Sequence, residues 1–233
     1  MTLIGFATIG ESPRDDVVPA ILQLIGPDVR AVECGCLDRL TRSEVDTLRP
    51  GSGEVGIVTL LKNGDFVLLS HSRILPRMQT CVDQLVNDEG AELVVILCGA
   101  DWSAVQCDRL VVNPGRLFPA TIGALAHGRK LGIIKPSAGQ VEQERARYAG
   151  IGIDAVVTSA SPYAGEDRLA LARAAAEKLA SENCDLIWMT CIGMDVEMRN
   201  VVTEVSRKPV MLAQALIARI VSELIPQSTA TGN

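Results

Sequence analysis

Two cysteines stand at similar places in two apolar runs, and each is followed by a glycine and an aspartate. The runs are "LVVILCGADW" at residues 93–102 and "LIWMTCIGMD" at residues 186–195, and the cysteines are Cys98 and Cys191. A thiolate can remove a proton from carbon, and a thiol on the opposite side can return one. The pair predicts that two thiols, one from each half of the chain, face each other across a small carbon acid and move its proton.

Both runs are typical of buried strands that end at a loop, which is where functional side chains gather in open α/β sheets. Backbone N–H groups after each cysteine are suited to bind a carboxylate and to favour the thiolate form. A glycine there lets a ligand approach the backbone closely. We therefore expect substrate contacts from the residues around the cysteines and a tuning or amine-binding role for the two aspartates: Gly99, Ala100, Thr190, Ile192 and Gly193, with Asp101 and Asp195.

The other five cysteines suggest no second chemistry. Cysteine is among the most often buried residue types, so Cys81, Cys107 and Cys184 are predicted to fill space. An odd number of cysteines without a secretion signal favours reduced thiols over disulfides. Cys34 and Cys36 point to the same face of a strand and could together bind a metal. The chain has only two histidines and no CxxC pair, so the other ligands of a zinc site are missing. No metal and no cofactor are predicted.

Composition excludes several classes of protein. Hydrophobic residues make up 48% of the 233, but aromatic residues only 3%, so the core must be aliphatic, as in parallel sheets covered by helices. The net charge is −6 and the basic residues are scattered, which excludes a nucleic-acid partner. No apolar run reaches the ~20 residues of a membrane helix, and residues 1–10 do not resemble a signal peptide. A cytoplasmic location is predicted.

The order of elements repeats along the chain and predicts an internal duplication. We expect an α/β fold of two pseudo-symmetric Rossmann-like subdomains, each a mainly parallel sheet flanked by helices. Asn63-Gly64 predicts a β-hairpin inserted in the first, and Thr41 with Glu44 predicts a helix capping box. The expected boundaries are 1–118 plus 205–226 for the first subdomain, about 54–74 for the hairpin, 119–204 for the second subdomain and 227–233 for a disordered tail.

The loop after the first strand supplies further candidates. Thr8, Gly10 and Ser12 belong to this loop, and Ser12 is also predicted to cap a helix that starts near Pro13. Arg14 matches a carboxylate in geometry and is the best candidate for a substrate clamp, although a solvated charge at a helix start explains it equally well. Gln140, after the segment "IKPSAG", is a second-tier candidate for substrate binding. Weaker candidates are Thr59, Lys62, Ser161 and Tyr163.

Several segments in order resemble one family. "TIGESPRDDVVP", "CGCLDRL", "VTLLKNGDFVLLS", "LVVILCGAD" and "KLGIIKP" are similar to the AroM-type proteins, a branch of the aspartate/glutamate/hydantoin racemase superfamily. The resemblance covers most of residues 8–195. It implies two facing α/β subdomains and two cysteines that act as acid and base without metal or pyridoxal phosphate. It also implies that Cys98 and Cys191 are those cysteines and that Thr8, Gly10 and Ser12 line the pocket.

The resemblance leaves the substrate and the reaction open. Glutamate and aspartate racemases commonly follow their cysteines with Asn-Thr and Thr-His, whereas this chain has Gly99-Ala100 and Ile192-Gly193. The superfamily also includes one-cysteine decarboxylases and cis–trans isomerases. We expect a racemase or epimerase acting at the α-carbon of a small substrate with a carboxylate or cyclic amide. The alternatives are a one-cysteine enzyme and a non-catalytic ligand-binding protein. Apolar helix faces are compatible with a homodimer.

Overall fold

The structure, a computed structural model, describes residues 1–226, so the tail expected at 227–233 lies outside the described residues. The chain forms two compact units, one of Met1–Leu117 with the chain from Arg219 onward and the other of Phe118–Ala218. Both boundaries fall inside helices, α4 (Pro114–Leu125) and α8 (Ala213–Leu224). Residues 205–218, grouped from the sequence with the first subdomain, lie in the second unit.

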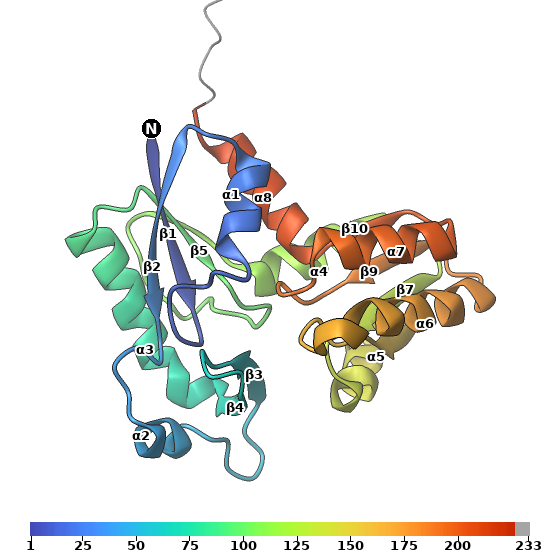
Figure 1. The fold of residues 1–233 in the computed structure, drawn as a ribbon, viewed down its shortest axis with the longest axis horizontal. Coiled ribbons are helices and arrows are strands. Elements are labelled where there is room, and N and C mark those ends of the chain that lie inside the picture. Colours follow the sequence, from blue (N-terminus) through green and yellow to red (C-terminus); the bar gives the residue numbers. More distant parts are fainter. Residues whose placement is uncertain (227–233) are drawn as a thin grey trace, which may run out of the picture. The chain divides into compact units, whose positions relative to one another are not determined.

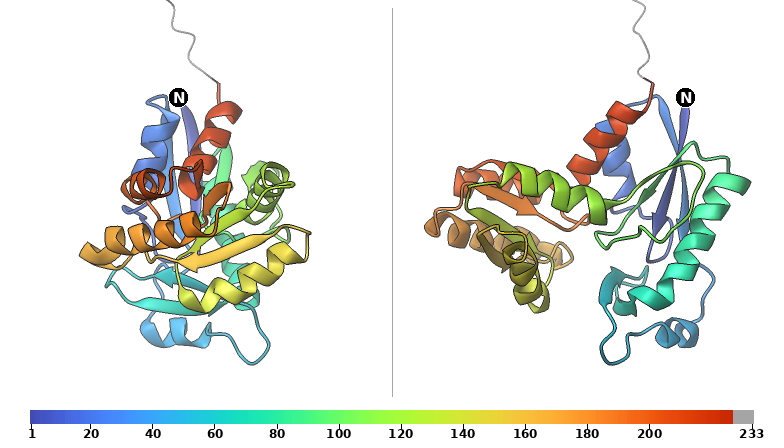
Figure 2. Two further views of the ribbon diagram at one scale, coloured as in Figure 1. Left: turned by 90° about the vertical axis from the view of Figure 1, so that its right-hand side faces the viewer. Right: turned by 180° about the vertical axis from the view of Figure 1, so that it is seen from behind.

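The first unit contains a four-stranded parallel sheet with the order β2-β1-β5-β6. Its central strands are apolar and buried because helices cover both faces, α1 on one side and α3 on the other (Figures 1 and 2). The strands are β1 (Thr2–Thr8), β2 (Val29–Gly35), β5 (Leu93–Ile96) and β6 (Leu110–Val112), and the helices are α1 (Val18–Ile25) and α3 (His71–Asp83), which continues as a wider turn at Gln84–Asp88.

The predicted hairpin is present in the first unit. Strands β3 (Gly56–Leu60) and β4 (Phe66–Ser70) pair antiparallel, and Gly64 in the connection has a φ of +88°, which glycine adopts without strain. The capping box is confirmed at the start of α2 (Arg42–Thr47), where the Thr41 and Glu44 side chains bind each other's backbone N–H. After β4 the chain enters α3 directly.

The second unit repeats this arrangement with a sheet of order β10-β9-β7-β8, again all parallel. Small alanine side chains let α6 and α7 pack closely on one face, and α5 contacts the sheet through β8. The strands are β7 (Leu131–Lys135), β8 (Ala155–Ser159), β9 (Leu186–Met189) and β10 (Val210–Leu212), and the helices are α5 (Val141–Ala149), α6 (Arg168–Ser181) and α7 (Val196–Ser206), with short 3₁₀ turns at Ala138–Gln140 and Gly165–Asp167.

The two sheets correspond strand by strand. In each unit the first strand pairs with the second on one side and with the third on the other, and the fourth strand adds beyond the third. The pairs β1/β7, β2/β8, β5/β9 and β6/β10 are therefore equivalent. This confirms the predicted α/β fold of two similar halves with an inserted hairpin. Within residues 1–226, the helices are all too short or too polar to cross a membrane.

Candidate active site

Cys98 and Cys191 occupy matching positions in the two units. Each is the second residue after a four-residue strand, β5 in the first unit and β9 in the second. These strands are equivalent by their place in the sheets. Both cysteines are partly buried, and both are thiols rather than disulfides. Each unit thus carries one thiol at the carboxyl edge of its sheet, where open α/β sheets place ligand sites.

The turn after Cys98 is open on one side and tightly packed on the other. A Cβ atom built on Gly99 would meet no atom within 4 Å, so a ligand has access to the backbone there. A Cβ atom built on Gly115 of α4 would lie 2.0 Å from the carbonyl oxygen of Ala100. Trp102 is only 1% exposed and its ring centroid lies 4.6 Å from that of His71. Gly99 is thus exposed and open to a ligand, and Ala100 beside it is partly buried.

Asp101 is engaged by its own turn. Its Oδ1 atom accepts hydrogen bonds from the Ser103 hydroxyl at 2.5 Å, the Ser103 N–H at 2.9 Å and the Asn113 amide at 3.0 Å. These bonds, the Ser103 hydroxyl first, hold the pKa of the Asp101 carboxyl below its usual value. Asp101 therefore stabilises the loop that carries Cys98.

The turn after Cys191 is covered by a tyrosine. The Met194 N–H donates to the Cys191 carbonyl at 3.1 Å and closes the turn. A Cβ atom built on Gly193 would lie 2.2 Å from the Tyr163 hydroxyl, so only glycine fits beneath that side chain. Ile192 is buried, whereas Gly193 is partly exposed. Tyr163, a weaker candidate from the sequence, is thereby placed at the Cys191 turn.

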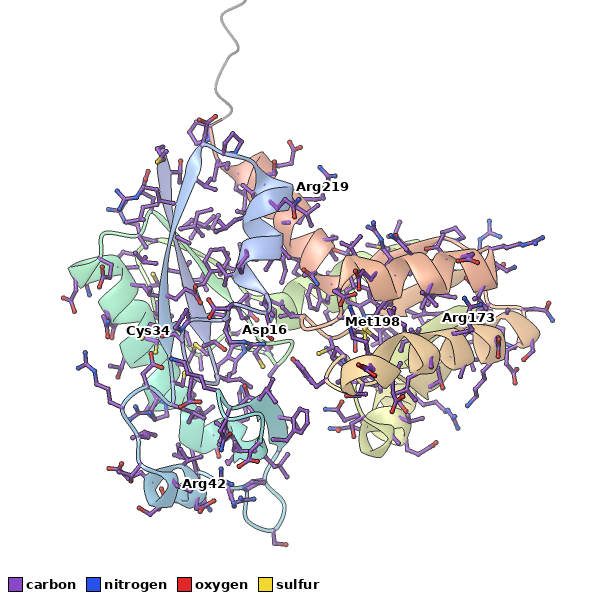
Figure 3. The ribbon with its side chains drawn as sticks, in the orientation of Figure 1. Asp16, Cys34, Arg42, Arg173, Met198 and Arg219 are labelled. Carbon is purple, nitrogen blue, oxygen red and sulfur yellow. The ribbon has the colours of Figure 1, made fainter. Side chains whose placement is uncertain are left out.

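Two other candidates near Cys191 have structural contacts. The Thr190 hydroxyl donates to the Ile134 carbonyl at 3.2 Å. Asp195 caps α7, because its Oδ1 accepts from the Met198 N–H at 2.8 Å, and its Oδ2 lies 3.3 Å from Nε of Arg168. The buried Met198 is labelled in Figure 3. Asp195 therefore fixes the start of the helix that follows Cys191.

The loop after β1 is tied to the end of β2 by Asp38. The Asp38 carboxylate accepts from the Ser12 N–H at 2.8 Å, the Ser12 hydroxyl at 2.5 Å and the Gly35 N–H at 2.8 Å. Ser12 is thus not the helix cap that the sequence suggested, because its hydroxyl is bound to Asp38 and α1 begins only at Val18. Gly10 passes so close to Thr59 that a Cβ atom would lie 2.5 Å from the threonine Oγ1.

Arg14 is buried and ion-paired within the same loop. Its Nε and Nη2 atoms each donate to Asp16 at 2.7 Å, and Nη1 donates to the Thr8 hydroxyl at 3.2 Å. Figure 3 labels Asp16 at this loop. Thr8 also accepts from the Gly10 N–H at 3.3 Å. A substrate carboxylate would have to compete with Asp16 for Arg14. Arg14 can therefore clamp a substrate only by releasing Asp16.

A pocket of about 260 Å³ opens beside this loop in the first unit. Arg14 and Lys62 supply positive charge and three carboxylates supply negative charge. The full lining is Glu11, Pro13, Arg14, Asp15, Asp16, Leu60, Leu61, Lys62 and Gly64. Apolar surface and charged side chains thus share its wall, and it includes the Arg14 and Lys62 candidates.

At the matching edge of the second unit, Lys135 was not foreseen. It ends β7, as Thr8 ends β1, and its side chain is 16% exposed. Its ammonium lies 3.4 Å from the Glu144 carboxylate. Gln140, in the loop that follows, has a buried Oε1 atom without a hydrogen-bond partner. A lysine at the carboxyl end of an apolar strand was the signal in the sequence that could have revealed Lys135.

Solved structures with a similar fold include three enzymes. Allantoin racemase from Klebsiella pneumoniae superposes with a TM-score of 0.62 at 13% identity, covering 100% of this chain and 97% of that one. Glutamate racemase from Francisella tularensis in complex with D-glutamate gives 0.57 at 11% identity, covering 96% and 80%. Unliganded arylmalonate decarboxylase gives 0.56 at 13%, covering 99% and 94%. At such identities the likeness establishes the fold.

The sequence itself gives a narrower result. No match was found among curated protein sequences. The family model described as "AroM protein" matches residues 4–225, which is nearly the whole chain. The chain therefore belongs to the AroM family.

Proposed function

We propose that this protein is a cofactor-independent racemase or epimerase that uses Cys98 and Cys191 as its acid and base. The observation that carries the proposal is the equivalence of the two thiols, each two residues past the third strand of its sheet. Chance placement of a space-filling cysteine does not account for two such positions. The shared fold with allantoin and glutamate racemases supports the same reaction class.

In the proposed reaction one thiolate removes the proton from the α-carbon, and the other residue, as a thiol, delivers a proton to the opposite face. The product is the mirror-image centre, and the two sulfur atoms have exchanged protonation states. Backbone N–H groups of the cysteine turns stabilise the enolate that forms, since fixed dipoles act strongly in a site that excludes water. Gly99 allows the substrate to approach this backbone, whereas the Tyr163 side chain occupies the space beside Gly193.

The substrate class we propose is a small molecule with a carbonyl beside the stereocentre, either a carboxylate or a cyclic amide. The related structures are named for D-glutamate and for allantoin, one of each kind. Lys62 in the pocket of the first unit supplies positive charge for a carboxylate, and Arg14 supplies more when the carboxylate displaces Asp16. The neighbouring carboxylates are suited to a substrate amine or amide N–H.

Solvent deuterium exchange tests this function. The protein is incubated in D₂O with single-enantiomer amino acids, hydantoins and hydroxy acids, and ¹H NMR follows the α-proton while chiral chromatography follows inversion. We expect one compound to lose its α-proton and invert. Inversion should fall by about 10²- to 10⁴-fold in both Cys98→Ser and Cys191→Ser, the usual contribution of one general acid or base.

The matched control is Cys107→Ser, since Cys107 is partly buried like the other two thiols but lies outside the turns. It should retain full activity. Decarboxylation or cis–trans isomerisation that survives one of the two serine variants would replace the proposal with a one-thiol enzyme. Binding without exchange, in folded protein whose thiols are reduced, would replace it with a ligand-binding role.

A further inference from the structure

Each unit places a side-chain amide at the carboxyl end of its fourth strand, beside the turn that carries the thiol. Asn113 follows β6, which pairs with β5, and Gln214 follows β10, which pairs with β9. The two amides therefore stand next to equivalent turns. Neither residue was a candidate from the sequence, because the fourth strands were not recognised there.

In the first unit the Asn113 amide binds the Cys98 turn through both of its polar atoms. Its Oδ1 atom accepts from the Trp102 N–H at 3.3 Å and from the Gly115 N–H at 3.1 Å. Its Nδ2 atom donates to Asp101 at 3.0 Å. One side chain thus connects the turn after β5 to the first turn of α4.

In the second unit the Gln214 amide binds the Cys191 turn. Its Nε2 atom donates to the Met194 carbonyl oxygen, and the N–H of Met194 in turn closes on the Cys191 carbonyl at 3.1 Å. The amide therefore holds Met194, the residue whose N–H closes the turn behind the thiol. The contact lies wholly within the second unit.

Packing alone does not explain a glutamine at position 214. Its side chain is 1% exposed, and its Oε1 atom is buried without a hydrogen-bond partner. A buried carbonyl that accepts no hydrogen bond costs stability, and an apolar side chain of the same length avoids that cost. A buried, half-satisfied amide that contacts the turn of a reactive thiol points to a role at that turn.

We propose that Asn113 and Gln214 are positioning residues that fix the turns of Cys98 and Cys191, so that each thiol and the N–H groups beside it keep one geometry. The catalytic meaning of this rests on the proposed two-thiol function. The structural claim is independent of it, because it concerns the local environment of each sulfur atom.

The test measures each thiol separately and needs no substrate. Iodoacetamide labelling from pH 6 to pH 10, read by peptide mass spectrometry, gives a rate and a pH profile for Cys98 and for Cys191 in the same sample. We expect Gln214→Met to change the Cys191 rate by about fivefold, the factor that corresponds to one hydrogen bond of ordinary net strength, and to leave Cys98 unchanged. Gln214→Leu should behave alike, because it also lacks the donor to Met194. Asn113→Leu should show the reverse selectivity.

Gln79→Met is the matched control. The Gln79 amide also binds a backbone segment, at Gln106, with two bonds of 2.8 Å, and this partner comes four residues after Trp102 in sequence. It should alter neither thiol. An unchanged Cys191 profile in Gln214→Met would overturn the proposal, as would an equal change at both thiols, which would indicate general loosening. Selective changes in a protein without racemase activity would support the positioning role and reject the two-thiol reaction.

Discussion

At the scale of single residues, the seven cysteines have sharply different surroundings. Cys98, Cys107 and Cys191 are partly exposed, and the other four are buried. The Cys34 thiol on β2, labelled in Figure 3, contacts the Cys81 sulfur on α3 at 2.6 Å. This hydrogen bond and burial raise the pKa of Cys34. Reactivity should therefore differ among thiols that the sequence alone presents as alike.

The first prediction concerns this pair. The pKa of Cys81 is also raised: the bond from Cys34 lowers it, but the bond to Cys36 and burial outweigh that effect. A raised pKa leaves less thiolate at any given pH, and only the thiolate is alkylated. At pH 8 in folded protein, Cys34 and Cys81 should resist iodoacetamide while Cys107 reacts, as peptide mass spectrometry will show. Equal labelling of Cys34 and Cys107 before unfolding would contradict this environment, and in urea the difference should vanish.

At the scale of elements, the turns after β5 and β9 carry Cys98 and Cys191 and determine which groups each thiol can contact. The second prediction compares two glycines near Cys98. In Gly115→Ala the new Cβ atom would lie 2.0 Å from the Ala100 carbonyl oxygen, so the backbone of the turn or of α4 must shift. We expect a loss of about 1–3 kcal/mol in the free energy of unfolding, as for other overpacked sites. Urea denaturation measures it.

Gly99→Ala is the control for this prediction, since its Cβ atom would enter open space. Its free energy of unfolding should stay within about 0.5 kcal/mol of the wild type, as for most exposed substitutions. If both variants were equally stable, the close approach of α4 to the Cys98 turn would be wrong.

The same elements show what sequence reasoning can reach. Long apolar runs identified the strands that precede Cys98 and Cys191, and turn chemistry identified the hairpin and the capping box at Thr41. Rules based on neighbouring residues failed where a residue distant in the sequence forms the hydrogen bond. Ser12 was expected to cap a helix, but its hydroxyl donates to the Asp38 carboxylate on another loop. The three-residue strands β6 and β10 were missed because such short apolar runs merge with the helices that follow. Asn113 and Gln214 were missed with them.

At the scale of the whole molecule, two similar four-stranded units supply two thiols at equivalent positions but with different neighbours. A tyrosine covers the turn in the second unit, whereas Gly99 in the first is open. The strand-end residue is Thr8 in one unit and Lys135 in the other. Under the proposed function, each thiol is the base toward one enantiomer and the acid toward the other, and this divergence gives the two thiols different surroundings in those roles.

The third prediction follows from having one proton donor in each unit. A single base that removed and returned the proton would label the substrate and the product alike. With two thiols, the thiol that delivers the proton exchanges with solvent before the reaction, so early in D₂O the product enantiomer should carry deuterium while recovered substrate retains its α-proton. Chiral separation followed by mass spectrometry, from either enantiomer, measures this. Deuterium appearing equally in both from the start would show that one residue performs both transfers, and the duplicated thiols would then need a different explanation.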